Sequence, residues 1–503
     1  MYNNFDFYPP ARSRSTQEYK GNISLDSLKN IFSLCGDFES RQIDFGLEGN
    51  CFLSVCWIDG IVAGVTMAED VIRPLTESIR AKRVRTIGEC YERIFQGSVY
   101  SYSVQKRNDL DSLITDLTHG RCAILFDGMN AALTFEVRSP VSRSISEPTL
   151  EKSIKGSKDS FVEILRINTS LVRRRICSPR LKLIESSIGR RSNTRVSVMF
   201  LDGLASPEIV SELSRRLDAV DVDALLATGS LEEYIVDAPL SPFPQLIHTE
   251  RPDRFAMYLM EGRVGILVDG LPLGIIVPVT LAEFMKVTSD SNMHFMVSTA
   301  LTVLRYTALL LGLLLPAVYV AVAMYHQEMI PTKLLLSIIS AKENVPFSTA
   351  IEVISMMVAF SLLQEASLRL PSPIGDTVSI IGALIVGQSA VEAQLVSPIA
   401  IIVVAVSGIA CYTLPSQDLG SAVRLVRWAL LLCAICAGLY GVGIFSCAVL
   451  LMLSNIDSFG VNYTAPLSGD EKWGLLKLLI RRPKPSDKFR DPILHTPDRR
   501  RQR

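Results

Sequence analysis

Histidine, paired cysteine and the motifs of the common enzyme classes are scarce in this sequence. The 503 residues include five His, too few to supply metal catalysis readily, and ten Cys. The first 294 residues contain no metal-ligand spacing, nucleophile elbow, Walker loop or G-x-G-x-x-G turn. We therefore expect no resident metal, no cofactor and no enzymatic activity, and we interpret this part of the chain as a binding or assembly module.

The chain also has no excess of either charge and no secretory segment at its start. It carries 51 Lys+Arg against 51 Asp+Glu, a balance that argues against nucleic-acid binding through bulk charge. Residues 1–19 lack the apolar run of about 7–15 residues that a secretory signal needs, so we expect the N-terminal half in the cytoplasm. The cysteines agree with a reducing compartment, because six of them lie in this half without a pairing pattern.

Charged residues are scarce in one long segment. Between positions 295 and 469 the sequence has only 6 Lys/Arg and 8 Asp/Glu. All the other charged side chains of the protein, the large majority, lie before or after this segment. This contrast predicts a water-soluble part followed by a membrane part.

An internal repeat organises the soluble part. Residues 120–128 read GRCAILFDG and residues 262–270 read GRVGILVDG, an offset of 142. Residues 53–60 read LSVCWIDG and residues 196–203 read VSVMFLDG, an offset of 143. The near-constant offset indicates that a unit of about 140 residues is duplicated.

Each copy is predicted to be a strand–helix–strand–strand unit. A helical pattern follows Asp59-Gly60 and Asp202-Gly203, whereas a second apolar run follows Asp127-Gly128 and Asp269-Gly270, as in a hairpin. We interpret Asp-Gly at these strand ends as turn geometry, the alternative being a carboxylate for acid–base chemistry or metal binding. The predicted fold class is an α/β N-terminal half of two similar units, followed by an all-α helical membrane domain.

Five apolar stretches fall within the membrane part. They are residues 301–324, 349–366, 376–393, 396–414 and 428–453. Because a spanning helix needs about 20 apolar residues, four of these stretches are predicted to cross the membrane. The exception is the segment 347–369, which contains Glu352, Glu365 and Arg369. Since charges near a helix centre are costly, this segment is predicted to be buried by neighbouring helices or to lie at the interface.

The basic C-terminal tail sets the predicted orientation. Residues 470–503 carry 11 Lys/Arg against 5 acids and should stay in the cytoplasm, either solvated or against anionic lipid headgroups. With both ends inside, the number of crossings must be even, which four spans satisfy. The predicted domains are residues 1–150 and 151–294 as the two α/β units, 295–469 as the membrane domain and 470–503 as the tail.

Several longer segments resemble one protein family. They are Arg143–Pro148 (RSISEP), Glu250–Arg254 (ERPDR), Glu261–Gly270 (EGRVGILVDG), Leu315–Tyr319 (LPAVY), Ile330–Thr332 (IPT), Glu365–Pro371 (EASLRLP), Pro373–Gly375 (PIG), Ile381–Ala393 (IGALIVGQSAVEA) and Ser458–Gly460 (SFG). In this order they resemble the A subunits of GerA-type spore germination receptors of endospore-forming bacteria, the GerA/SpoVAF family. The resemblance covers most of the chain, roughly residues 139–466.

The resemblance implies a non-enzymatic protein of the inner spore membrane. Such proteins act with a B subunit that looks like an amino-acid transporter and with a C-subunit lipoprotein. Together they sense nutrients and trigger cation release, so the implied role is to form or gate a cation-conducting pathway, in a homo-oligomer. Two alternatives stay open. One is an auxiliary family member that supports a dipicolinate channel, and the other is a secondary transporter, which should show an inverted repeat in its membrane half.

The candidate functional residues all lie in the membrane part. Glu352, Arg369 and Glu392 are predicted to be buried among helices, either in an ion path or in structural pairs. The helix 376–393 is predicted to line an ion pathway in a symmetric oligomer, with Gly375 and Gly382 on a face of small residues that packs on a neighbouring helix. The opposite face is polar at both ends and apolar in the middle, as in a pore that gates by dewetting. This face carries Thr377, Ile381, Leu384, Gln388 and Glu392. The alternative is an ordinary helix of the bundle.

Overall fold

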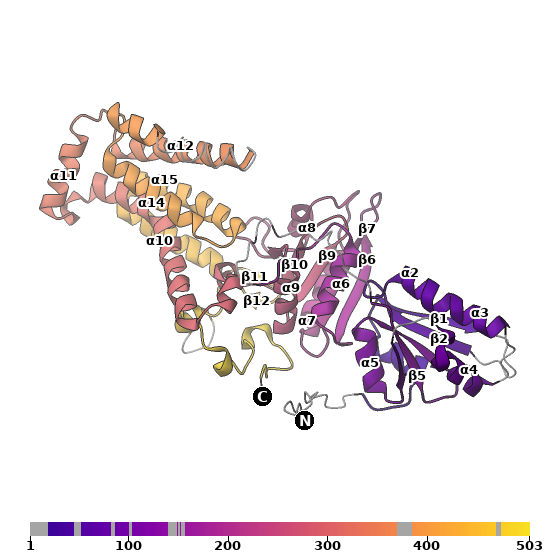
Figure 1. The fold of residues 1–503 in the computed structure, drawn as a ribbon. Helices are drawn as coiled ribbons and strands as arrows, with labels where there is room; N and C mark the ends of the chain where they lie inside the picture. The colour runs from indigo at the N-terminus through magenta and orange to yellow at the C-terminus, as the bar shows by residue number, and fades with distance from the viewer. Residues whose placement is uncertain are drawn as a thin grey trace, which may run out of the picture.

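Two α/β units and a helical half follow one another in space as they do in the sequence (Figure 1). The computed structural model describes residues 19–44, 52–81, 86–99, 103–138, 148, 151, 156–369, 385–468 and 474–502. The first unit lies at one end of the molecule, the second unit in the middle, and the helices at the other end. The second unit is therefore the one that meets the helical half.

The first unit is a five-stranded antiparallel sheet with helices on both faces. In the spatial order β1-β2-β4-β5-β3, its strands are β1 (Phe38–Asp44), β2 (Phe52–Ile58), β4 (Arg121–Phe126), β5 (Ala132–Glu136) and β3 (Val104–Arg107). One face carries α1 (Leu25–Ile31) and α5 (Leu110–Thr118). The other face carries α2 (Gly64–Thr66), the π-helix η1 (Met67–Ile72), α3 (Arg73–Ala81), α4 (Ile87–Arg93) and the π-helix η2 (Ile94–Ser98). Because successive strand residues point to opposite faces, Val55 and Ile124 enter one core while Cys56 and Ala123 enter the other.

The second unit repeats this arrangement. In the order β6-β7-β9-β10-β8, its strands are β6 (Leu181–Ile188), β7 (Thr194–Leu201), β9 (Val264–Val268), β10 (Gly274–Val277) and β8 (Ile247–Thr249). One face carries α7 (Pro207–Asp218) and α8 (Thr228–Ile235), and the other carries α6 (Leu165–Arg175) and α9 (Pro252–Glu261). The fully buried runs of β9 and β10 fit a sheet that is covered on both faces.

The predicted duplication is confirmed by the matching strand orders of the two sheets. Strand β2 corresponds to β7 and β4 corresponds to β9, as the sequence matches predict. In the hairpins β4–β5 and β9–β10, Asp127-Gly128 and Asp269-Gly270 begin the turn between the strands. Each unit has five strands, whereas the sequence predicts three. The additional strands lie at the edges of the sheets and carry no sustained apolar run, so the sequence gives no signal for them. All four glycines of the Asp-Gly pairs have positive φ between 74° and 86°, a conformation that favours glycine, and this supports the interpretation as turns.

A buried ion pair joins the two units. Arg173 of α6 and Asp37, which precedes β1, are 0% and 2% exposed. The guanidinium donates to both carboxylate oxygens, at 2.7 Å from Nη2 and 2.9 Å from Nε. The backbones also meet, because Gly36 N donates to Leu183 O at 2.9 Å and Leu183 N donates to Leu34 O at 2.9 Å. The first unit is thus fixed to strand β6 and helix α6 of the second.

The helical half begins directly after the second unit. Two short 3-10 helices, η3 (Leu281–Met285) and η4 (Thr288–Asn292), lead into it. Its elements are α10 (Phe295–Tyr325), η5 (Gln327–Met329), α11 (Thr332–Lys342), α12 (Thr349–Arg369), the helical residues 385–392, α14 (Pro398–Tyr412) and α15 (Gln417–Ser454). Among the described residues, three helices are long and apolar enough to cross a membrane: Phe295–Tyr325, Thr349–Ala366 and Gln417–Ser454.

Helix α12 occupies most of the segment 347–369. It is a continuous helix of 21 residues, and 18 of them have the length and hydropathy of a membrane span. Its first turn is buried by neighbouring helices, one of the two positions that the sequence predicts, and the prediction that the segment does not cross the membrane stays a prediction. Glu352 lies in the first turn and Glu365 near the last, so the centre of the helix carries no charge. In contrast, α14 has 15 residues, about 22 Å, and is shorter than the predicted span 396–414.

Helix α15 is a hairpin of two arms and not one long span. Its backbone leaves the helical region at Ala437 and at Gly438, where φ is 61° and ψ is −144°. Beyond this break the chain turns back, because a Cβ at Gly441 would lie 2.3 Å from the carbonyl oxygen of Cys433, eight residues earlier. Both ends of α15 contact the second unit, through Asp418 at the start and Leu453 near the end. The predicted single crossing at 428–453 is therefore wrong in the described structure.

The C-terminal tail packs on the second unit. It contains α16 (Gly474–Leu479), η6 (Lys484–Ser486) and η7 (Pro492–Leu494). Leu494 is 3% exposed and joins the core beneath α7 and α8. Arg490 Nε donates to the carbonyl of Met260 at 3.1 Å, and Arg501 pairs with Glu261 at 3.3 Å. The described tail is therefore held by protein, although the sequence predicts a solvated or lipid-bound segment.

Candidate functional site

The structure describes three of the predicted membrane site residues with their side chains. Glu352 is completely buried, with an exposed fraction of 0%, and pairs with Lys342 at 3.0 Å. Gln388 and Glu392 are exposed, and Gln388 Nε2 donates to Glu392 Oε1 at 2.9 Å. The prediction that Glu392 is buried among helices is therefore wrong for the single chain. Gln388 and Glu392 share a face, because they lie one helical turn apart.

The other predicted site residues cannot be compared with the structure. Arg369 is the last residue of α12, and its side chain lies outside the described part. Five further residues also lie outside the described residues, so the predicted packing face and most of the predicted pore face stay predictions. They are Gly375, Thr377, Ile381, Gly382 and Leu384.

A site that the sequence does not predict lies where the second unit meets the helices, and we call it the junction. One apolar cluster runs through it without interruption. The cluster includes Phe255 and Leu259 of α9, Ala317 and Ala321 of α10, and both arms of α15. Because packed interiors transmit displacements, a shift of the second unit must move α10 and α15 as well.

The segment after α15 docks into the second unit through buried hydrogen bonds. It forms the short strands β11 (Asp457–Ser458) and β12 (Val461–Asn462). The hydroxyl of Tyr463, a fully buried residue, donates to the carbonyl of Pro244 at 2.7 Å, and Val279 N donates to Ser458 Oγ at 3.2 Å. Phe459 N donates to Asp237 Oδ2 at 2.9 Å. The end of α15 and the start of α10 are thus held on the same side of the helical half, by the same unit.

Two arginines, Arg305 and Arg481, hold the N-terminal end of α10, and we call them the clamp. Arg305, in the third turn of α10, donates to both carboxylate oxygens of Asp290 in η4, at 2.5 and 2.9 Å. Arg481 of the tail donates to the carbonyls of Asp290 and of Ser291. The backbone N of Arg481 donates to Thr299 Oγ1 at 3.1 Å. These bonds tie the tail, the linker before α10 and α10 itself into one connected group.

A small cavity with charged walls lies beside the clamp. Its volume is about 60 Å³, room for a few water molecules, and its walls come from the second unit, α10 and the tail. Arg263 Nη2 lies 3.1 Å from Glu283 Oε1, and Lys286 Nζ lies 2.7 Å from the same oxygen. Burial opposes ionisation of Glu283, but Lys286 and Arg263 outweigh it and lower its pKa to about 2. Glu283 is therefore ionised under all physiological conditions.

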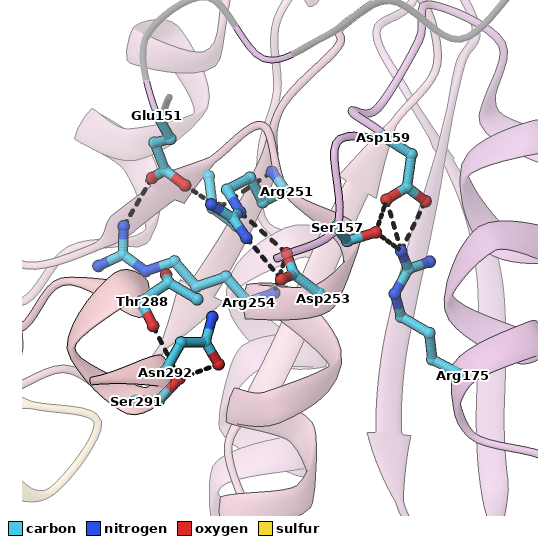
Figure 2. A network of polar contacts seen from close by, with 11 residues as sticks. Glu151, Ser157, Asp159, Arg175, Arg251, Asp253, Arg254, Thr288, Ser291 and Asn292 are labelled. Carbon is cyan, nitrogen blue, oxygen red and sulfur yellow. Dashed lines mark hydrogen bonds and ion pairs between the residues drawn. The ribbon is translucent and has the colours of Figure 1, made fainter. Parts of the chain in front are cut away.

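Figure 2 shows a further polar network, which connects the segment between the two sheets to α9. Arg254 Nη1 donates to Glu151 Oε1 at 2.6 Å, and the hydroxyl of Thr249 donates to Glu151 Oε2 at 2.9 Å. Arg251 is bidentate to Asp253, at 3.0 and 2.6 Å. Because α9 also contributes to the apolar cluster of the junction, this network links the segment between the two sheets to the helices.

A histidine joins the edge strand β8 to the start of α15. His248 Nδ1 lies 3.6 Å from Asp418 Oδ2 in the first turn of α15, and Nε2 lies 4.0 Å from Glu232 Oε2 of α8. Burial lowers the pKa of His248, but Asp418 and Glu232 outweigh it, so the pKa lies above the ordinary value of 6.5. Burial raises the pKa of Glu232, against the opposing effect of His248.

This contact predicts a pH dependence of stability. Because the pKa of His248 is raised in the folded state, its stabilising effect is complete below pH 6.5 and is lost as the pH rises through the folded-state value. We expect His248→Gln to reduce the difference in stability between pH 6 and pH 8.5 by about 1 kcal/mol. Thermal melting of the purified chain in detergent at both pH values measures the effect. His119→Gln, at an exposed histidine of the first unit, is the control. Equal pH profiles for the wild type and His248→Gln would contradict the prediction.

Parts of the junction lie in the segments that carry the family resemblance. Arg251, Asp253 and Arg254 belong to ERPDR, Arg263 belongs to EGRVGILVDG, and Ser458 belongs to SFG. The sequence shows these segments but not that they meet, because they are separated by up to about two hundred residues along the chain. Within the described residues, no group of three or more His, Cys, Asp or Glu side chains is placed to hold a metal ion.

Comparisons with known proteins show which family the chain resembles. The model of the family described as Bacillus/Clostridium GerA spore germination protein matches residues 26–493. Spore germination protein KA of Bacillus subtilis (strain 168) is 34% identical over 98% of this chain and 88% of its own length. Stage V sporulation protein AF of the same organism is 30% identical over 81% of this chain and 83% of its own length.

A solved structure is also similar. The crystal structure of the N-terminal domain of the A subunit of the Bacillus megaterium spore germinant receptor GerK3 is 27% identical. It covers 52% of this chain and 98% of that chain, with a TM-score of 0.40. Because the family model spans the two α/β units, the helical half and most of the tail, the chain belongs to the GerA family of spore germination proteins.

Proposed function

We propose that this protein is the A-type membrane subunit of a spore germination receptor, and that it forms or gates a cation-conducting pathway with partner subunits. The observation that carries the proposal is the junction, where one apolar cluster and several buried hydrogen bonds connect a soluble unit to α10 and to both arms of α15. A nutrient signal that moves the soluble part would move these helices with it. The proposed partners are a transporter-like B subunit, a C-subunit lipoprotein and further copies of this chain.

The proposed location is the inner membrane of the spore. The long apolar helices among the described residues and the family relationship support a germination-related membrane protein. We place both α/β units and the C-terminal tail in the cytoplasm, since the basic tail packs on the second unit. Residues 376–393 are proposed to line the pathway, with Ile381 and Leu384 as its apolar constriction. The exposed pair Gln388 and Glu392 is then available to face neighbouring subunits or the pathway.

An auxiliary role in dipicolinate release is the second candidate function. It is favoured by the similarity to Stage V sporulation protein AF, which covers 81% of this chain. The two roles differ in which germination responses depend on the protein. A receptor subunit is required for particular nutrients, whereas an auxiliary protein affects the response to every nutrient.

Deletion of the gene tests both roles. We expect spores that lack it to lose their response to one class of nutrient while other triggers still act, because a receptor subunit senses only its own signal. Germination is followed by potassium and dipicolinate release across a panel of amino acids, sugars and bile salts. A slowed response to all nutrients would support the auxiliary role instead. Unchanged responses in deletion spores, and in spores that overproduce the protein, would contradict both.

A further inference from the structure

The far end of the helical half contains a carboxylate that is completely withdrawn from solvent. Glu352, in the first turn of α12, precedes Val353, and its hydrogen-bond partner Ser397 follows Val396; both valines are buried members of one apolar cluster. Its Oε2 atom accepts a hydrogen bond from the backbone N of Ser397 at 2.8 Å. A buried carboxylate in such surroundings requires a positive charge or a proton to balance it.

The balancing charge comes from a loosely packed helix. Lys342, the last residue of α11, places its ammonium group 3.0 Å from Glu352 Oε1 and donates to Thr349 Oγ1 at 2.5 Å. Its side chain is 23% exposed, and Ile338 is the one buried side chain of α11. Helix α11 lies at the end of the molecule that is remote from the α/β units (Figure 1). Few packing contacts therefore hold the ammonium group in place.

A buried tyrosine hydroxyl also interacts with the carboxylate of Glu352. Tyr319 of α10 interacts with both Ser397 and Glu352. Its hydroxyl is buried and has no hydrogen-bond partner of good geometry among the described residues. Oxygen ligands suit hard metal cations, and an ammonium group and a potassium ion are similar in size and charge. A single carboxylate balances one positive charge, so a divalent ion would leave an unbalanced charge among apolar side chains.

We propose that Glu352, together with the hydroxyls of Thr349 and Tyr319, forms a binding site for a monovalent alkali cation, which Lys342 occupies as a tethered cation in this conformation. Displacement of α11 withdraws the ammonium group and leaves the site for potassium or a related ion. The proposal goes beyond the proposed function, since binding is a property of the isolated chain whether or not the protein is a germination receptor. The ammonium group of Lys342 then competes with the ion for this site.

Replacing Lys342 by a side chain without a charge tests the site. In Lys342→Met, potassium should replace the ammonium group, so the melting temperature should rise by several degrees, and saturably, when KCl or RbCl replaces choline chloride at constant ionic strength and pH 8. The wild type and the double variant K342M/E352Q should show no such rise. Lys333→Met, at an exposed lysine of the same helix, is the matched control. The assay uses the full-length chain purified in detergent.

Three results would overturn the proposal. The first is a folded K342M variant that melts at the same temperature in KCl and in choline chloride. The second is a rise in KCl that is as large in K342M/E352Q as in K342M, which would place the bound ion away from Glu352. The third applies if K342M fails to accumulate. Lys342→Gln, whose amide still donates to the carboxylate, is then assayed in the same way. If neither K342M nor K342Q accumulates in potassium-loaded cells, and adding E352Q to each restores its accumulation, potassium does not replace the ammonium group and the proposal is wrong.

Discussion

Replacing Asp37 with Asn should destabilise the contact between the two α/β units by about 3–5 kcal/mol, because the change leaves the guanidinium of Arg173 buried and unpaired. Both residues are at most 2% exposed, so water cannot take the place of the lost carboxylate. The remaining carbonyl partners of the guanidinium, Leu181 O at 2.8 Å and Ser178 O at 3.2 Å, carry no full charge. Hydrogen–deuterium exchange across β1 and α6 during a urea titration of the purified chain measures the effect.

Two further variants complete this experiment. The double variant D37N/R173M should recover much of the lost stability, since removing both charges ends the cost of burying one of them alone. Asp70→Asn, at an exposed aspartate of the first unit, should change the urea midpoint little. A D37N variant as stable as the wild type would show that the pair does not hold the units together.

A second large effect is expected at the hairpin of α15. Gly441→Leu should prevent the two arms from packing, because even its Cβ would lie 2.3 Å from the carbonyl oxygen of Cys433 and 3.0 Å from Ala437 Cβ. The neighbouring atoms are largely backbone and cannot move aside, so the cost should reach about 3 kcal/mol or more. The expected result is a large loss of monodisperse protein after purification in detergent, and a lower melting temperature for what remains.

Gly443 offers a matched control on the same arm. A Cβ at Gly443 meets no atom within 4 Å, so Gly443→Leu adds the same side chain to the same apolar helix without a clash. This variant should accumulate like the wild type. If the two variants behave alike, the arms do not lie against each other as described, and α15 is then better regarded as one continuous span.

The sequence predicts the duplicated core of the soluble part well, and for a physical reason. Strands β2, β4, β7 and β9 are buried on both faces, so each is a continuous apolar run, and Asp-Gly marks the turn at its end. The strand β1, FESRQID, lies at the edge of its sheet and pairs on one side alone. Its mixed polar composition gives no strand signal that differs from that of a loop.

In the helical half, the pattern of hydropathy decides less. Because of the charges of α12, the sequence predicts that this segment does not cross a membrane; the charges lie at its ends, where Glu352 is paired with Lys342, and this stays a prediction. The apolar run of α15 suggests one span because hydropathy does not register a reversal of the chain. Three glycines within six residues, at 438, 441 and 443, were the available signal, since glycine permits both the turn and the close approach of the arms.

The junction could not be predicted, because its contacts join residues that are distant in the sequence. Tyr463 and Pro244 are 219 residues apart, and Arg481 and Asp290 are 191 apart. No periodicity or local motif records which of these segments meet. The exposed position of Glu392 was likewise unpredictable, since an apolar neighbourhood in the sequence does not show which face of a helix its neighbours cover.

The apolar cluster at the junction also constrains how family members can exchange parts in evolution. The abrupt change in charge density near residue 294 looks like a natural crossover point between a soluble module and a membrane module. A recombination there would separate Phe255 and Tyr258 of the second unit from Leu419 and Tyr463, with which they share one interior. We therefore expect the soluble half of one relative to fold with the helices of another only when residues 417–466 are exchanged together with it.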